Sequence, residues 1–231
     1  MDLVVSLGPI LCPLLSCLCI WISLYAIISI INTNRSPEWN CRLVTIIHAI
    51  VSTALSYWCA FRTGPWPFDT FGEASTQFQT LIATITLGYF LFDFTWCLYM
   101  GTEGLNMLAH HMISVYSLSY IVINGYSGSE IVATIFGSEM TNPFLQMRWF
   151  LRETGNYELR IAYINDLVFL TLFLFLRLGP GTSVLYWTLK SSKPALVVKA
   201  GGIGLYLVGV VWSFYIMLFA CKRFFGKKKV T

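Results

Sequence analysis

Seven apolar stretches of this sequence are each close to the length that a helix needs to cross a membrane. They cover residues 3–31, 43–61, 81–100, 104–123, 131–151, 161–178 and 202–221. A crossing helix requires roughly 20 consecutive, mainly apolar residues. Lipid offers no hydrogen-bond partner to backbone N–H and C=O groups, so such stretches must satisfy those groups internally, as helices. We therefore expect an all-α polytopic membrane protein with about seven transmembrane helices.

Charged residues are scarce and lie mostly between these stretches. The chain has 15 Lys and Arg, 11 Asp and Glu, and a mean hydropathy of +0.68. No gap is long enough for a soluble domain, and no face suits nucleic acid. We divide the chain into an N-terminal membrane anchor and loop (1–39), one membrane domain (40–222) and a basic cytoplasmic tail (223–231). Segment 179–200, with two prolines and three lysines, is predicted to be a lumenal or interfacial loop.

The distribution of basic residues predicts the orientation. Cytoplasmic loops carry an excess of Lys and Arg, and a lumenal N-terminus with a cytoplasmic C-terminus puts ten of the 15 on the cytoplasmic side. Arg177 is counted with the lumenal group. The sequon at Asn34 then lies in the first cytoplasmic loop and is expected to stay unglycosylated. We expect an integral membrane protein of the endoplasmic reticulum.

A histidine pair, His110 and His111, lies inside the fourth apolar stretch. If that stretch enters the membrane just after Gly104, His110 lies about 9 Å deep at 1.5 Å per residue. A titratable group at such depth is costly and marks a functional site by default. On a helical wheel His110 shares a face with Asn106 and Ser114. We therefore expect His110 to point inward, with His111 as its support.

Buried carboxylates accompany the pair. Asp93 lies about 10 Å from the end of its stretch and requires a partner, for which the three histidines of the chain are candidates. Glu139 shares a helix face with Asn142 and Gln146. Pro143 cannot donate a backbone hydrogen bond to the carbonyl of Glu139, which predicts a kink at the proline.

These side chains form the predicted site. The predicted catalytic residues are His110, His111, Asp93 and Glu139. The predicted substrate-binding residues are His48, Asn142, Gln146, Arg148 and Asp166. Each has a structural alternative, as a hydrogen bond between helices or, for Arg148, as a side chain reaching for the membrane surface. We expect no metal, because two adjacent histidines on a regular helix cannot easily aim at one ion.

Four sequence motifs carry a resemblance to a known family. They are HAIVST from His48, GYFLFD ending at Asp93, the pair His110 and His111, and EMTNPFLQMRW from Glu139. In combination, over residues 40–222, they resemble the TLC domain. This family joins the translocating-chain-associating membrane protein, the longevity-assurance ceramide synthases and a ceroid-lipofuscinosis membrane protein. The order and spacing resemble the small TLC-domain-containing proteins. The resemblance implies a six-helix barrel formed by the second to seventh spans, with the first span outside it.

The resemblance also implies a role in membrane lipid homeostasis. In the ceramide synthases the histidine pair is followed by a His-Asp pair, whereas this chain has Ile135 to Glu139 there. This departure argues against ceramide synthesis, and Glu139 is the candidate for the missing carboxylate. We expect histidine-dependent acyl transfer to a lipid amine or hydroxyl, with acyl-CoA as co-substrate and no bound cofactor. The alternative is a non-catalytic lipid-binding protein, a regulator of membrane composition or a trafficking module.

The last four residues support a trafficking signal. Lys228 and Lys229 occupy the positions of a dilysine retrieval signal, which a vesicle coat reads. Replacing both lysines with serine is expected to shift the protein from the endoplasmic reticulum to later compartments, as measured by microscopy against organelle markers. An unchanged distribution would remove the vesicle coat from the list of partners, leaving membrane lipids.

Overall fold

Helices account for nearly all of the regular structure in this computed structural model, which describes residues 2–101 and 103–225. The helices are α1 (Asp2–Ile31), α2 (Pro37–Trp58), α3 (Gln77–Met100), α4 (Leu105–Asn124), α5 (Gly128–Glu139), α6 (Asn142–Glu153), α7 (Arg160–Leu178), α8 (Pro180–Lys190) and α9 (Leu196–Ala220). Short π-helical segments, η1 (Cys59–Thr63) and η2 (Cys221–Phe225), extend α2 and α9. Lys228 and Lys229 lie outside the described residues.

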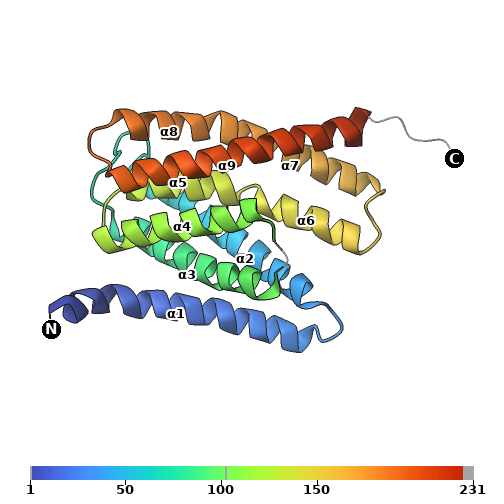
Figure 1. Cartoon of the computed structure of the whole chain (residues 1–231), viewed down its shortest axis with the longest axis horizontal. Helices are drawn as coiled ribbons and strands as arrows, with labels where there is room; N and C mark the ends of the chain where they lie inside the picture. The colour runs from blue at the N-terminus through green and yellow to red at the C-terminus, as the bar shows by residue number, and fades with distance from the viewer. Residues whose placement is uncertain (1, 102, 226–231) are drawn as a thin grey trace.

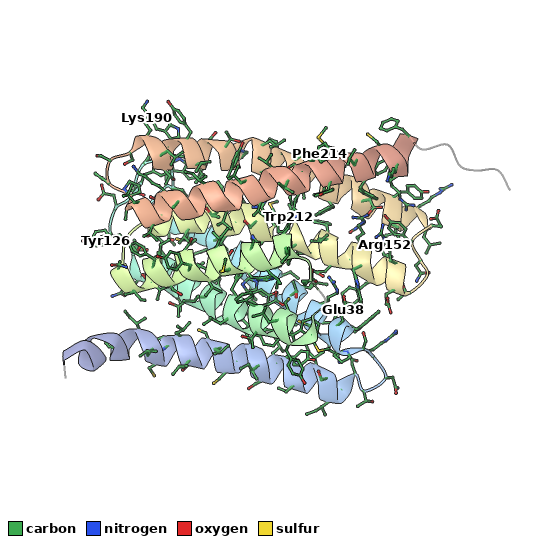
Figure 2. The ribbon with its side chains drawn as sticks, viewed as in Figure 1. Glu38, Tyr126, Arg152, Lys190, Trp212 and Phe214 are labelled. Atoms are coloured by element: carbon green, nitrogen blue, oxygen red, sulfur yellow. The ribbon has the colours of Figure 1, made fainter. Side chains whose placement is uncertain are left out.

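The helices after α1 form a closed ring. Going around it, α2 packs on α3, α3 on α4, α4 on α9, α9 on α7 and α8, and these on α5 and α6, which return to α2. Helix α1 lies outside the ring, against α3 (Figure 1). Lys190 and Tyr126 mark one end of the barrel, and Glu38 and Arg152 mark the other (Figure 2). This arrangement confirms the expected six-span barrel with the first span outside it.

The outer surface of the barrel is apolar, as a lipid-facing surface must be. Ile30 is 73% exposed, Leu207 58% and Phe214 61%. Five helical segments are long and apolar enough to cross a membrane by length and composition. Helix α4, at 20 residues, has the length but carries the histidine pair and several serines. Together these features define an integral membrane protein.

Two predicted boundaries were wrong. The fifth span breaks between Glu139 and Asn142, before Pro143, which occupies the first turn of α6. At that position the missing N–H of proline costs nothing, so Pro143 starts a helix instead of kinking one. Segment 179–200 is largely helical, because α8 continues α7 after Gly179 and together they form a stretch of 31 residues, Arg160–Lys190. Lys190 and Lys199 lie at helix ends, and Lys193 lies in the connection between α8 and α9. Lys199 donates to the carbonyl oxygens of Leu189 and Ser191.

Close backbone approach fixes α1 against the barrel. A Cβ atom at Gly88 would lie 2.8 Å from Cys17 Cβ and 3.0 Å from the backbone nitrogen of Leu18. Further along α1, Trp21 is buried and its indole N–H donates to the carbonyl oxygen of Ile85 at 3.2 Å. Helix α1 therefore packs closely against α3, on the outside of the barrel.

Gly88→Ala is expected to destabilise the protein by about 1–3 kcal/mol, because the added methyl group overpacks the contact between α1 and α3. The measurement is thermal unfolding of the purified protein in detergent. Gly8→Ala is the matched control, since a Cβ atom at Gly8 meets nothing within 4 Å. Equal melting temperatures for the two variants would contradict the packing shown here.

Candidate functional site

A cavity of about 470 Å³ opens inside the barrel toward the end where α2 begins. We call it the polar cavity, because charged and polar side chains from α2 to α7 line it, facing an aromatic wall on α9 that includes Trp212. Each of the predicted site residues lines this cavity, except His48 and Asp166. The side chains that converge here come from spans far apart in the sequence.

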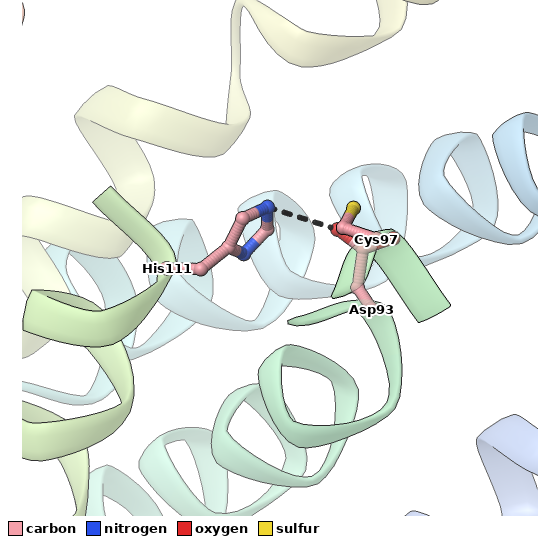
Figure 3. Close-up of side chains that lie close together, drawn as sticks. All are labelled: Asp93, Cys97 and His111. Atoms are coloured by element: carbon pink, nitrogen blue, oxygen red, sulfur yellow. Dashed lines mark ion pairs between the residues drawn. The ribbon is translucent and has the colours of Figure 1, made fainter. Parts of the chain in front are cut away.

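Asp93 and His111 form an ion pair across the interface between α3 and α4. His111 Nε2 lies 3.4 Å from Asp93 Oδ2, and both side chains are buried (Figure 3). The Cys41 thiol donates to the other carboxylate oxygen at 3.6 Å. The second imidazole nitrogen, His111 Nδ1, is buried without a hydrogen-bond partner among the described residues. The structure thus places one predicted carboxylate beside one predicted imidazole.

His110 lies on the cavity wall beside this pair. Its ring centroid is 5.1 Å from that of Trp212 and 5.7 Å from that of His111. No carboxylate of residues 2–101 or 103–225 lies within ion-pair distance of it. The prediction made His110 the inward residue and His111 its support, whereas both line the cavity and His111 holds the carboxylate. The helical wheel could not show this, because Asp93 belongs to a different helix.

His48 lies behind the cavity wall. It is fully buried and stacks on Tyr89, with ring centroids 3.7 Å apart. Its Nδ1 lies 3.6 Å from Glu139 Oε2, and Trp21 of the outer helix packs edge-on against the same ring. His48 was predicted to bind substrate, and the structure places its imidazole behind the cavity lining, next to Glu139, which does line the cavity.

A chain of hydrogen bonds runs from Glu139 to the mouth of the cavity. Asn142 donates to Glu139 Oε2 at 3.1 Å, and Gln146 donates to Asn142 at 2.9 Å. Arg42 Nη1 donates to Gln146 Oε1 at 2.9 Å. The line crosses the break between α5 and α6, from the last residue of one helix to the first turns of the next.

Arg42, at the mouth of the polar cavity, is the last residue of this line of hydrogen bonds. Its guanidinium lies 2.7 Å from Glu38 and 3.6 Å from Glu103. Burial raises the pKa of Glu103, and the charge of Arg42 opposes that rise. Sequence reasoning counted Arg42 only as a cytoplasmic charge. Its spacing of four residues from Glu38 was the available signal, because such residues meet on one helix face.

Asp166 belongs to a separate cluster near the same end of the barrel. It is fully buried and accepts hydrogen bonds from the Tyr157 hydroxyl at 2.8 Å and from Arg223 Nε at 3.2 Å. Arg148 Nε lies 3.4 Å from its other oxygen. Asp166 was predicted to bind substrate, and the structure places its carboxylate outside the polar cavity, where it joins α6, α7 and η2. Arg148 lines the cavity, but its charge is paired with Asp166.

One group of side chains could hold a metal ion. The ligand atoms of Asp93, Cys97 and His111 all lie within 4.8 Å of one another, and all three residues are buried (Figure 3). Imidazole, thiolate and carboxylate are the ligands that Zn²⁺ prefers. The sequence offered three histidines and three buried acids as possible ligands, but nothing in it combined one histidine with a cysteine from another helix.

The fold and the cavity define a helical-barrel membrane protein with ionisable groups converging in its interior. The chain belongs to the TLC domain family, whose model matches residues 38–224. TLC domain-containing protein 4 A of Dictyostelium discoideum is 29% identical over 152 residues, which are 64% of this chain and 58% of that protein. TLC domain-containing protein 4-B of Danio rerio is 22% identical over 219 residues, or 85% of this chain and 78% of that protein. TLC domain-containing protein 1 of Homo sapiens is 22% identical over 190 residues, or 80% and 72%.

Asp166→Asn is expected to cost about 3–5 kcal/mol of stability, because it removes one member of a buried ion pair and leaves guanidinium groups without their partner. Thermal unfolding in detergent measures the loss. Glu158→Gln is the matched control: Glu158 also pairs with Arg223, but its side chain is 75% exposed, so the change should be close to zero. A substrate-binding role for Asp166 would instead leave the unliganded protein almost as stable as the wild type.

Proposed function

We propose that the protein takes up a membrane lipid in the polar cavity and that the histidine pair transfers an acyl group to an amine or hydroxyl. Members of the TLC domain family are usually membrane proteins of lipid metabolism or homeostasis. The observation that carries the finer proposal is the pairing of His111 with Asp93 in the wall of a cavity, beside the second imidazole of His110. A histidine held by a carboxylate is the arrangement of a general base.

The contacts suggest separate roles for the two imidazoles. With Nε2 of His111 facing Asp93, the tautomer that donates to the carboxylate leaves Nδ1 as a proton acceptor. His111 would take the proton of the attacking hydroxyl or amine. The acyl carbon then bonds to that oxygen or nitrogen as the thioester C–S bond of acyl-CoA breaks, and the proton passes from the imidazolium to the departing thiolate. His110 contacts the acyl group from the adjacent wall.

The surroundings of the cavity fit this use. Arg42 at the mouth and Arg148 in the wall are each paired with a carboxylate of the protein, and they offer guanidinium N–H donors where a phosphate-bearing donor would enter. We propose the endoplasmic reticulum as the location, with the mouth on the cytoplasmic side, because the basic residues concentrate at that end.

A second candidate function is lipid binding without chemistry. A second, larger cavity of about 680 Å³ lies in the other half of the barrel, and its walls are mainly apolar. It contains neither histidine of the pair. A barrel with such a chamber could carry or sense a lipid while its polar residues specify helix packing.

The two functions differ in what His111→Ala removes. We expect the variant to lose acyl transfer by ~100- to 10,000-fold, the usual contribution of a general base, while it retains co-purifying lipid. Asp93→Asn should also lower the rate of acyl transfer. The measurement is transfer of labelled acyl groups from acyl-CoA into extracted lipids, with bound lipid identified by mass spectrometry.

Tyr116→Phe is the matched control, because this side chain lies on the same helix and is 62% exposed. Bound lipid without transfer in the wild type would favour the non-catalytic function. The absence of both lipid and transfer, together with unchanged cellular lipids in a His111→Ala line, would contradict both candidates.

A further inference from the structure

Arg177 is a cation in the middle of a span. Helices α7 and α8 together cover Arg160–Lys190, so the nearer end lies 13 residues away, or about 20 Å at 1.5 Å per residue. Arg177 lies near the middle of this stretch and lines two internal cavities, so its guanidinium lies in the barrel interior. Its charge must be compensated inside the barrel.

The contacts of Arg177 do not supply that compensation. Nη1 donates to the Ser138 hydroxyl at 3.0 Å, and the guanidinium lies 5.2 Å from the ring centroid of Phe173. Nε is buried and has no hydrogen-bond partner in the part of the chain that the structure describes. Neutral partners of this kind leave the charge itself unbalanced.

No carboxylate forms an ion pair with Arg177 in residues 2–101 and 103–225, whereas the guanidiniums of Arg42, Arg148 and Arg223 each have at least one such partner. Glu139 is the acid whose charge acts on Arg177. Its carboxylate is shared with Asn142 and His48 and lies beyond ion-pair distance of the guanidinium. The Arg177 guanidinium therefore has no carboxylate within ion-pair distance in the part of the chain that the structure describes.

Arg177 lies where the two cavities of the barrel meet. Arg177 lines both the polar cavity and the larger second cavity, which we call the apolar cavity. Phe61, Trp66 and Phe136 contribute aromatic rings to the apolar cavity. Its volume falls within the range of about 300–1,000 Å³ typical of ligand pockets. A cation at the junction of a polar and an apolar chamber matches a ligand with an anionic head and a hydrocarbon tail.

We infer that Arg177 binds the oxyanion of an amphiphile whose hydrocarbon chain occupies the apolar cavity. A guanidinium binds carboxylate and phosphate through two parallel N–H bonds, so a fatty-acid carboxylate and a lipid phosphate share the required chemistry. This inference rests on the proposed function in that it names the class of ligand for the same barrel. The head group at Arg177 faces the chamber that contains the histidine pair.

The test compares ligands that share one chain and differ in charge. Oleate, oleoyl lysophosphatidate and uncharged methyl oleate are titrated against the full-length protein in an uncharged detergent. We expect the wild type to bind one of the two anions at least about tenfold more tightly than methyl oleate. The preferred anion identifies carboxylate or phosphate as the natural head group.

The variants separate charge recognition from folding. Arg177→Gln is expected to lose the preference for the anion while its affinity for methyl oleate stays unchanged, and Arg177→Lys should keep part of the preference. Arg62→Gln is the matched control, because Arg62 is exposed at the end of the barrel and its loss should change neither affinity. Without ligand, Arg177→Gln should be at least as stable as the wild type, since it removes an uncompensated buried charge.

The outcomes distinguish this inference from the proposed function. Equal affinity of the wild type for the anions and methyl oleate would overturn the role of Arg177 without the need for any variant, while leaving the lipid-binding barrel intact. If the Arg177→Gln variant keeps the preference for anions, another residue recognises the anionic head group. Failure of the wild type to bind any of the three chains would overturn the proposed function together with the inference.

Discussion

Compensation of charge inside a hydrocarbon-facing barrel is the constraint on which this structure depends. The outer surface of the barrel is apolar, so each ionisable side chain of the interior has to find its partner on another span. Asp93 meets His111, Glu139 meets His48, and Asp166 meets Arg148 and Arg223. Asp93 with His111 and Arg148 with Asp166 join consecutive helices, whereas His48 with Glu139 and Asp166 with Arg223 join helices far apart in the sequence.

The break between α5 and α6 shows how local backbone structure serves the site. On a continuous helix Glu139, Asn142 and Gln146 would share one face. The hydrogen bond from Asn142 to Glu139 is present across the interruption, and the line of hydrogen bonds continues through Gln146 to Arg42. Pro143 favours this geometry because its ring suits the first turn of a new helix. A second interruption at Gly179 divides α7 from α8 and leaves Arg177 near the middle of the combined span. Both interruptions lie next to side chains that line a cavity.

The two cavities divide the interior by chemistry. The polar cavity holds the histidine pair, and the apolar cavity offers hydrocarbon surface, with Arg177 lining both. The outer helix contributes to this interior indirectly, because Trp21 packs against His48 and Tyr89. Helix α1 therefore supports the wall behind the site although it stands outside the ring.

The sequence by itself determined the fold class and the resemblance to the TLC domain implied the barrel, while all but two of the predicted site residues line the polar cavity. It could do so because apolar length and buried charge are local properties that lipid constrains strongly. Only the tertiary structure decided which carboxylate meets which imidazole, since a helical wheel describes one helix and His111 is paired through a residue of another. The sequence also placed Arg177 at a membrane edge, because Pro180 and three lysines suggested a loop. Packing of α8 against α5 and α9 made that segment helical and left the guanidinium in the middle of a span.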